Sequence, residues 1–471
     1  MGSVAPSPDS PKKAERMPLS RPGRIVAALL LLSPCSGGTA GAQSTDIVAL
    51  AKAGDDAAVH VLLEQGVAVD GTAGDGTTAL HWAAYHQQAQ LASALLDAGA
   101  SVNAANDLGV TALWVASQNG HAPTVRRLLD AGADVGLALL AGETALMVAA
   151  RSGAVEVVDL LLAHGANPEA RGTRGQTALM WAVAQHHPDA VARLLAGGAN
   201  VHARSDVWSE VMAAPPHGQP EYNREIPHGG NTALMFAARG GDVASARTLI
   251  AAGANVDDTD AWGVSATTLA AHAGFGELVA LLLEAGADPN ASQAGFAAIH
   301  PAVMRQDEQL VATLLDHGAD PNAVLRTWTP IRRASRDFNF APPLVGATPF
   351  WLAARFTAPA VMRLLAERGA DPLFVHHADY KEPSYSRPRQ ESITALMAAT
   401  GMGGGRLRAW FPVDRGEAEM RALESVQVAV ELGVDLNTTD ADGRTALDGA
   451  RSARMKTVAD YLESRGAVPG G

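Results

Sequence analysis

The sequence predicts an all-α solenoid, in which helix pairs stack along one axis. The first observation is a fixed period: glycines stand 33 residues apart at Gly76, Gly109, Gly142 and Gly175. The second is composition, because alanine and glycine are abundant while aromatic residues make up only 5% of the chain. Small residues let neighbouring helices approach closely, and a period of roughly 20 to 50 residues is typical of repeat architectures.

Three consecutive units show the repeat plainly. Gly109 begins GVTALWVASQNGHAPTVRRLLDAGADV, Gly142 begins GETALMVAARSGAVEVVDLLLAHGANP, and Gly175 begins GQTALMWAVAQHHPDAVARLLAGGANV. This pattern resembles the ankyrin repeat family, whose units read G-x-T-P-L-H-x-A-A, then a glycine-containing turn, then L-L-x-x-G-A-D/N. The resemblance covers most of the chain. It implies helix-turn-helix units joined by finger hairpins, and a protein partner lying across the concave face.

Each recurring letter also has a mechanical reason. A threonine at the start of the first helix caps free backbone N–H groups, and the Ala-Ala pair lets helices approach. The Leu-Leu pair of the second helix supplies the core between units, at about 1.5 to 3 kcal/mol for each buried side chain. The glycine that follows ends that helix in the left-handed conformation, and an Asp or Asn begins the next turn.

Two features depart from the family pattern. The usual proline is alanine in most units, and the motif histidine stands in its usual position only at His81 and His300. Four tryptophans lie near that position in first helices and are expected to fill the core between units: Trp82, Trp114, Trp181 and Trp351.

Breaks in the period define the organisation, which comprises ten units with a recognisable first helix and one degenerate unit before them. We expect an N-terminal extension and signal peptide (1–42), a degenerate N-capping repeat (43–75), ankyrin repeats (76–201), a finger insertion (202–229), repeats (230–322), a finger insertion (323–345), a repeat (346–372), a finger insertion (373–391), a repeat (392–442) with an insertion at 404–419, and a C-terminal capping repeat (443–471). The three insertions of the C-terminal half should therefore lie on neighbouring units.

The N-terminal region predicts export. Arg21 and Arg24 precede an apolar run at 25–32, and a small-residue stretch ends at Ala42, where cleavage is expected. The predicted location is therefore periplasmic or secreted. An alternative makes Cys35 a lipid-anchored cysteine, although the proline before it disfavours this reading. No other stretch approaches the roughly 20 apolar residues of a membrane helix, and we expect a monomer.

Charge and aromatic content point to the inserted loops. The net charge of −13 disfavours nucleic acid as a partner, yet residues 323–345, 373–391 and 404–418 together hold ten Lys or Arg and six Asp or Glu. Arginine and aromatic side chains dominate binding hot spots. The predicted partner-binding residues are Trp208, Tyr222, Trp328, Arg332, Arg333, Arg336, Phe338, Phe340, His376, His377, Tyr380, Tyr385, Arg387, Arg406 and Trp410. Alternatively, the loops fold back and pair with the acidic scaffold.

Signatures of catalysis are weak. The sequence holds no G-x-S-x-G, phosphate-binding loop or H-E-x-x-H motif, so we predict no enzyme, cofactor or metal site. His376 and His377 are expected in a solvated loop. The predicted function is a non-enzymatic scaffold for a protein partner. The alternatives are an enzyme or small-ligand receptor, in which His376, His377 and Arg332 or Arg333 act on an anion, and a secreted host-directed effector.

Overall fold

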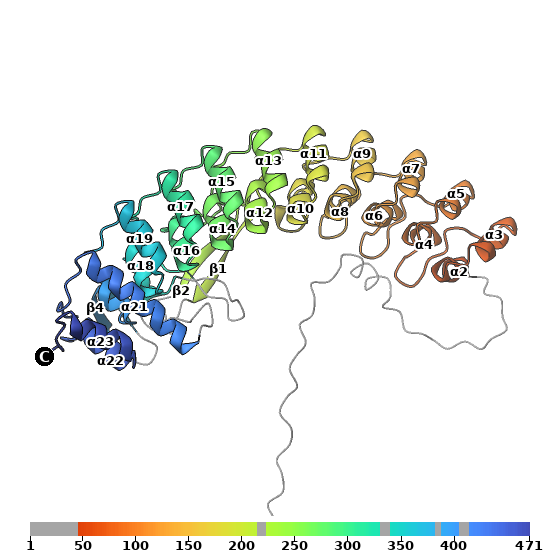
Figure 1. Cartoon of the computed structure of the whole chain (residues 1–471). Helices are drawn as coiled ribbons and strands as arrows, with labels where there is room; N and C mark the ends of the chain where they lie inside the picture. Colours follow the sequence, from red (N-terminus) through yellow and green to blue (C-terminus); the bar gives the residue numbers. More distant parts are fainter. Residues whose placement is uncertain (1–45, 214–222, 330–339, 382–387, 405–413) are drawn as a thin grey trace, which may run out of the picture.

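The chain forms a curved stack of helix pairs. A computed structural model describes residues 46–213, 223–329, 340–381, 388–404 and 414–471. In these ranges 22 helices form eleven pairs, which lie side by side along an arc (Figure 1). The first helix of each pair lies on the inner side of the arc and the second on the outer side. The all-α solenoid predicted from the repeat is therefore confirmed.

The helices are short and evenly sized. The inner helices are α2 (Ile47–Ala53), α4 (Ala79–Tyr85), α6 (Ala112–Gln118), α8 (Ala145–Ser152), α10 (Ala178–Ala184), α12 (Ala233–Gly240), α14 (Ala266–Ala273), α16 (Ile299–Met304), α18 (Pro349–Arg355), α20 (Ala395–Ala399) and α22 (Ala446–Ser452). The outer helices are α3 (Asp56–Glu64), α5 (Ala89–Asp97), α7 (Ala122–Asp130), α9 (Val155–Ala163), α11 (Pro188–Ala196), α13 (Val243–Ala251), α15 (Gly276–Glu284), α17 (Glu308–Asp316), α19 (Pro359–Glu367), α21 (Arg415–Glu431) and α23 (Lys456–Ser464).

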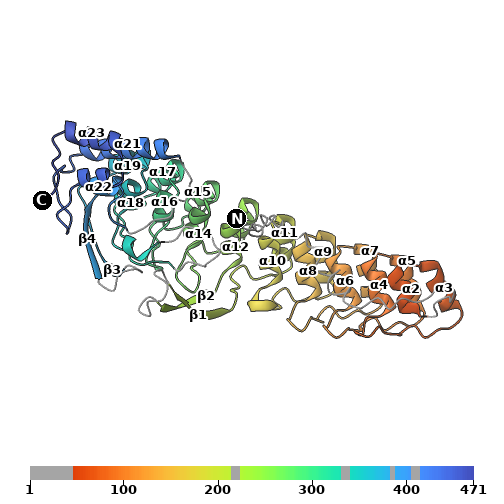
Figure 2. The same ribbon diagram turned by 90° about the horizontal axis from the view of Figure 1, so that it is seen from below.

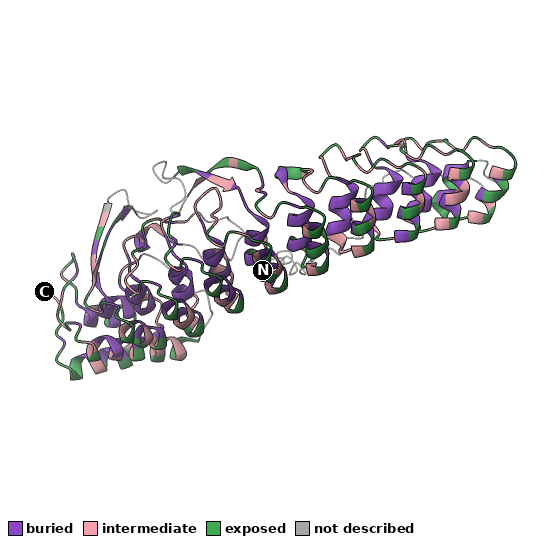
Figure 3. Cartoon of the chain, turned by 90° about the horizontal axis from the view of Figure 1, so that it is seen from above, coloured by how far each residue is buried: buried purple, intermediate pink, exposed green. Residues whose placement is uncertain are grey.

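The core lies between the two rows of helices. Residues 79–84 of α4 are all buried, whereas the outer helices bury one side only (Figure 3). The first leucine of the Leu-Leu pair is fully buried in successive units, as at Leu128, Leu161 and Leu194. Each such leucine contributes about 1.5 to 3 kcal/mol through the hydrophobic effect.

Threonine caps the inner helices as the repeat predicts. The Thr111 hydroxyl accepts a hydrogen bond from the backbone N–H of Trp114 at 3.2 Å. The same bond recurs at Thr144, Thr177, Thr348 and Thr394. Each cap satisfies one of the free N–H groups that every helix start leaves.

A ring near the start of the inner helix joins neighbouring units in three places. Three rings donate a hydrogen bond to a backbone carbonyl of the following finger: His81 to Val110 at 2.8 Å, His300 to Ala323 at 3.0 Å, and Trp351 to Ile393 at 3.0 Å. Trp351 thus makes the bond that the motif histidine makes elsewhere. Its place in the core was predicted, whereas this polar role was not.

The fingers share one closure. In six short fingers a backbone N–H bonds to the carbonyl four residues later, as from Ala73 to Thr77 at 2.8 Å. In two fingers with insertions the same closure spans a longer segment, from Ser205 to Asn231 at 3.0 Å and from Leu325 to Ala347 at 2.9 Å. The insertions therefore extend the finger tips and leave the helix stack unchanged.

Two insertions form β-hairpins. β1 (Val207–Ala213) pairs antiparallel with β2 (Asn223–Gly229), and β3 (Val375–Lys381) pairs antiparallel with β4 (Pro388–Thr394). In register, Trp208 stands opposite His228 and His376 opposite Ile393. Short 3₁₀ turns lie in two other fingers, at Thr173–Gly175 and Pro342–Leu344. Seen from below, both hairpins project from the finger edge of the stack (Figure 2).

The insertion expected at 404–419 differs in part from the prediction. It does lie between the two helices of one pair, α20 and α21, but residues 415–419 are helical and lengthen α21 to 17 residues. Asp414 caps this extension, because its carboxylate accepts from the N–H groups of Gly416 and Glu417. Across the described part of the chain, no helix combines the length and apolar character needed to cross a membrane.

Glycines with positive φ provide a test of this geometry. Gly132 (φ +85°) and Gly142 (φ +81°) share the left-handed conformation, but a Cβ at Gly132 would meet nothing within 4 Å, whereas one at Gly142 would lie 2.7 Å from the Arg171 carbonyl oxygen. We expect Gly132→Ala to cost about 1 to 2 kcal/mol of unfolding free energy. Gly142→Ala should cost at least about 1 kcal/mol more, because the backbone must also shift. Urea unfolding measures both, and equal losses would contradict this contact.

Candidate partner-binding surface

The β1–β2 hairpin has one covered face and one open face. Side chains alternate across a strand, so Trp208 shares a face with Ile226 and His228, which come from the opposite strand. Ile226 is buried and Trp208 is half-buried. On the other face Val207 and Val211 are 62% and 70% exposed. The hairpin therefore presents these valines to solvent, while on its other face Ile226, Trp208 and His228 are wholly or partly covered and Glu210 and Arg224 stay exposed.

Two arginine–tryptophan contacts connect this hairpin to the fingers on both sides. The guanidinium of Arg174, in the preceding finger, lies over the Trp208 ring with 4.4 Å to the ring centre. The guanidinium of Arg224, in β2, lies over the Trp328 ring at 5.2 Å. The Trp208 ring also stacks with His228 at 5.7 Å. These contacts hold the hairpin against its neighbours, because a cation over an indole face is attracted by its electron density.

A row of aromatic rings supports the next fingers. Trp262 contacts Phe296 with ring centres 5.8 Å apart, and Phe296 contacts Phe340 at 5.1 Å. Phe340 then meets the edge of His300 at 6.2 Å. Burial lowers the pKa of His300 to about 4. The rings therefore form a continuous apolar base beneath the fingers.

The ends of the second insertion are joined at this base. The Thr329 N–H donates to the Phe340 carbonyl at 2.9 Å, and the Phe340 N–H donates to the Thr329 hydroxyl at 2.8 Å. Both residues thus belong to the body of the protein.

His376 anchors the β3–β4 hairpin to the core. Its ring lies 4.2 Å from the Trp351 ring, and its Nε2 donates to the Val345 carbonyl at 3.1 Å. The side chain is fully buried, and burial lowers the pKa of His376 to about 4; the neighbouring charge of His377 lowers it further. His377 follows on the same strand and is exposed on the opposite face.

A buried carboxylate fixes the same hairpin from the other strand. Glu391 accepts hydrogen bonds from the Tyr380 hydroxyl at 2.7 Å and from the Gly404 N–H at 3.0 Å. The guanidinium of Arg389 lies 3.5 Å away. Arg355 lies beneath, where burial lowers its pKa to about 10 although the charge of Glu391 opposes this shift. The hairpin is therefore held by a network of satisfied polar groups.

The fifteen predicted binding residues differ in whether the structure describes them and in how far they are buried. Nine lie outside the described residues: Tyr222, Arg332, Arg333, Arg336, Phe338, Tyr385, Arg387, Arg406 and Trp410. Of the other six, Trp328, Phe340, His376 and Tyr380 are buried, which corrects the expectation that they face a partner. Trp208 is half-buried and His377 is exposed.

The expected solvated loop at 376–377 is also corrected. This segment is a strand whose two histidines point to opposite faces, so they cannot act together on one anion or metal ion. Within the described ranges, no group of three or more His, Cys, Asp or Glu side chains is arranged to hold a metal ion.

The sequence did not single out the surface features of the first hairpin. These are Arg174, Arg224 and the exposed valines Val207 and Val211. The only signal was the break in the repeat, because strand alternation within 202–229 becomes readable once both strands and their register are known.

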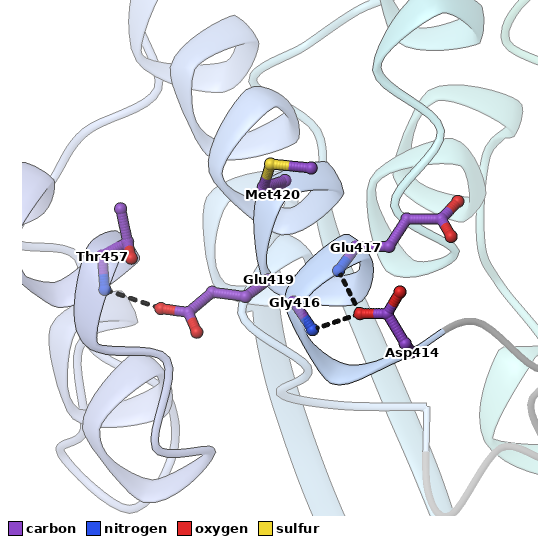
Figure 4. A pocket seen from close by; sticks show the side chains of 6 residues that line it. All are labelled: Asp414, Gly416, Glu417, Glu419, Met420 and Thr457. Carbon is purple, nitrogen blue, oxygen red and sulfur yellow. Dashed lines mark hydrogen bonds between the residues drawn. The ribbon is translucent and has the colours of Figure 1, made fainter.

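A pocket at the start of α21 has a structural explanation. It is lined by Asp414, Gly416, Glu417, Glu419, Met420 and Thr457 (Figure 4). Asp414 caps α21, while Glu419 accepts from the Thr457 N–H at 2.6 Å and so caps α23. Glu417 pairs with Arg421 at 2.7 Å. Asp414 and Glu417 thus stabilise the start of α21, and Glu419 joins α21 to α23.

The repeats match those of a known protein family. The family model for ankyrin repeats in sets of three copies matches residues 47–138, 136–205, 218–293 and 234–324. The chain belongs to the ankyrin repeat family. Repeats of this family are generally scaffolds for protein–protein interaction and are typically non-enzymatic. Beyond residue 324, helices α18–α23 continue the same stack.

Two relatives illustrate the similarity. Over 251 residues the chain is 30% identical to an ankyrin repeat and KH domain-containing protein of Caenorhabditis briggsae. The matched region covers 52% of this chain and 9% of that protein. The chain therefore spans about a tenth of the length of this relative. Among solved structures, the human ASB11 ankyrin repeat domain is similar with a TM-score of 0.41 and 29% identity, over 50% of this chain and 96% of that domain.

Proposed function

We propose that this protein is a non-enzymatic scaffold that binds a protein partner across the inner side of its arc, with the inserted fingers, the β1–β2 hairpin among them, setting specificity. One observation carries the proposal. The β1–β2 hairpin projects from the finger row with Val207 and Val211 exposed, while contacts at Trp208 and Arg224 fix its other face to the body. A surface held in place before binding loses little conformational entropy on association.

The β3–β4 hairpin supports the same proposal. Its covered face is fixed through His376 and Glu391, and its open face carries His377 and Asp379. Two rigid projections of different character, one apolar and one polar, thus stand at the same edge of the stack (Figure 2). Such an arrangement suits recognition of a folded surface, because interfaces combine apolar contacts with a polar rim.

The experiment removes the first hairpin without disturbing the stack. Residues 206–230 are replaced by Gly-Asp-Gly, the segment that the Ala73–Thr77 closure encloses in a short finger. Partners captured by the parent are identified by mass spectrometry and tested again as purified proteins. We expect the replacement to weaken binding at least about tenfold, a loss of about 1.4 kcal/mol.

The control variant changes the outer side. Arg126 and Glu156 form an exposed ion pair across outer helices α7 and α9, and replacing both with alanine should leave affinity within about twofold. Equal binding by the hairpin replacement and the parent would refute the assignment of this hairpin to the interface. Export stays a separate prediction, since residues 1–45 lie outside the described part; N-terminal sequencing of the secreted protein tests cleavage after Ala42.

A further inference from the structure

We propose that the covered edge of the β1–β2 hairpin, where Arg174 and Arg224 lie over Trp208 and Trp328, recognises an acidic polypeptide segment. This inference rests on the proposed function, because it names the chemistry of the partner at the same hairpin. The four residues are called the Arg–Trp surface below. They come from three different fingers, and the hairpin contributes one arginine and one tryptophan.

The two arginines differ from their neighbours in having unused donors. Arg204 donates to two carbonyls, those of Gly230 at 2.9 Å and Thr259 at 2.7 Å, and pairs with Asp258 at 2.7 Å. The side chains of Arg174 and Arg224 are exposed, and among the described residues neither makes a hydrogen bond or an ion pair. Each guanidinium lies over a ring face, and no acceptor among the described residues takes up its N–H donors.

The backbone at Arg174 supports a role for its side chain. Among the described residues six non-glycine residues have positive φ, and five of them lie in turns between the helices of a pair: Gln87, His186, Gln306, Thr357 and Arg454. Arg174 alone lies in a finger, with φ 58° and ψ 30°. A non-glycine residue in this region is uncommon and costs free energy that glycine avoids. The arginine is thus held where its guanidinium covers Trp208.

Nearby acids form no ion pair with the two arginines among the described residues. Asp206 lies 3.7 Å from Arg171. Glu210 shares the face of Trp208 and Arg224, and its carboxylate lies 4.0 Å from the His228 ring. Glu225 follows Arg224 on the strand and therefore points to the other face of the hairpin. The stacked arginines are consequently not neutralised by these groups.

Carboxylates fit the Arg–Trp surface best. A guanidinium offers two parallel N–H donors that match a carboxylate, and its contact with an indole face restricts the side chain before binding. An acidic polypeptide presents separate carboxylates that can meet the two arginines one by one. A long, uniformly charged polyanion such as nucleic acid would also lie against the acidic remainder of the chain, whose net charge is −13, whereas a short acidic segment need meet only the two arginines.

The test uses the full chain and three labelled peptides of equal length, in which serine alternates with glutamate, glutamine or lysine. Fluorescence anisotropy measures binding at low salt. We expect the glutamate peptide to bind most tightly and to lose affinity as salt is raised, because exposed charges are screened. Arg174→Gln combined with Arg224→Gln should weaken its binding at least about tenfold.

The matched control changes charge equally on the outer helices. Arg126 and Arg193 are exposed there and paired with Glu156 and Asp159, so Arg126→Gln with Arg193→Gln should alter affinity less than about twofold. Arg174→Lys with Arg224→Lys keeps charge but loses the planar donors, and should bind more weakly than the parent. Circular dichroism checks that each variant keeps the fold.

The outcomes separate this inference from the proposed function. Equal binding of the glutamate and glutamine peptides by the parent, or equal binding of the glutamate peptide by the parent and the double glutamine variant, would overturn the inference. If a partner is lost on hairpin replacement yet retained by the double glutamine variant, the proposed function stands and the acidic recognition is refuted. Loss of that partner in both variants supports both.

Discussion

Acidification is expected to destabilise the protein steeply as the pH falls from 6.5 to about 4, because His300 and His376 are buried as neutral rings. Burial lowers the pKa of each from 6.5 to about 4 in the folded state. Between pH 6.5 and about 4 the unfolded chain therefore binds protons at these two histidines while the folded chain does not. The free energy of unfolding consequently decreases as the pH falls through this range. Each histidine contributes about 3 kcal/mol to this loss.

Substitution of the two histidines isolates their share from that of the carboxylates. His300→Gln keeps a donor for the Ala323 carbonyl, and His376→Gln keeps one for the Val345 carbonyl, but neither variant can become a buried cation. Each variant should be less stable than the parent at neutral pH. Urea unfolding over the pH range should show this difference shrinking by about 3 kcal/mol as the pH reaches about 4. A difference that stays constant with pH would contradict the buried neutral rings.

The helix stack could be predicted from sequence because its causes are local and repeated. Thr111 caps its own helix, and Leu128 and Leu161 occupy the same place in successive units. A single unit therefore explains all its copies. Trp351 marks the limit of this reasoning: its size predicted burial, but its bond to the Ile393 carbonyl depends on where an inserted hairpin returns to the stack.

The candidate surface could be predicted only as a region. The breaks in the period predict where the finger insertions lie, but the faces of their strands depend on register. His376 and His377 are neighbours in sequence, yet one is in the core and the other is in solvent. Arg224 and Trp328 meet although they belong to different insertions. Arg224 and Trp328 belong to fingers that are not consecutive in the sequence. The repeat pattern holds no information about contacts between such fingers.

Removal of the charge on Glu391 should loosen the β3–β4 hairpin and destabilise the last units. Glu391 is buried, accepts from Tyr380 and the Gly404 N–H, and its negative charge acts on the half-buried Arg355 and on Arg389. Glu391→Gln keeps much of the shape and removes that charge. We expect a loss of about 2 to 3 kcal/mol, because hydrogen bonds to a charged group are lost in a buried site. Thermal unfolding measures the loss, and hydrogen exchange should show faster exchange in residues 375–394.

Two further variants separate charge from hydrogen bonding in this network. Tyr380→Phe removes one neutral donor and should cost about 1 kcal/mol. Glu424→Gln makes the same chemical change on an exposed side chain of α21 and should stay within about 0.5 kcal/mol of the parent. If Glu391→Gln costs no more than Glu424→Gln, the carboxylate does not hold the hairpin. If it costs several times more than Tyr380→Phe, the lost negative charge beside Arg355 and Arg389 is the main cause, because both variants disturb the same tyrosine hydrogen bond.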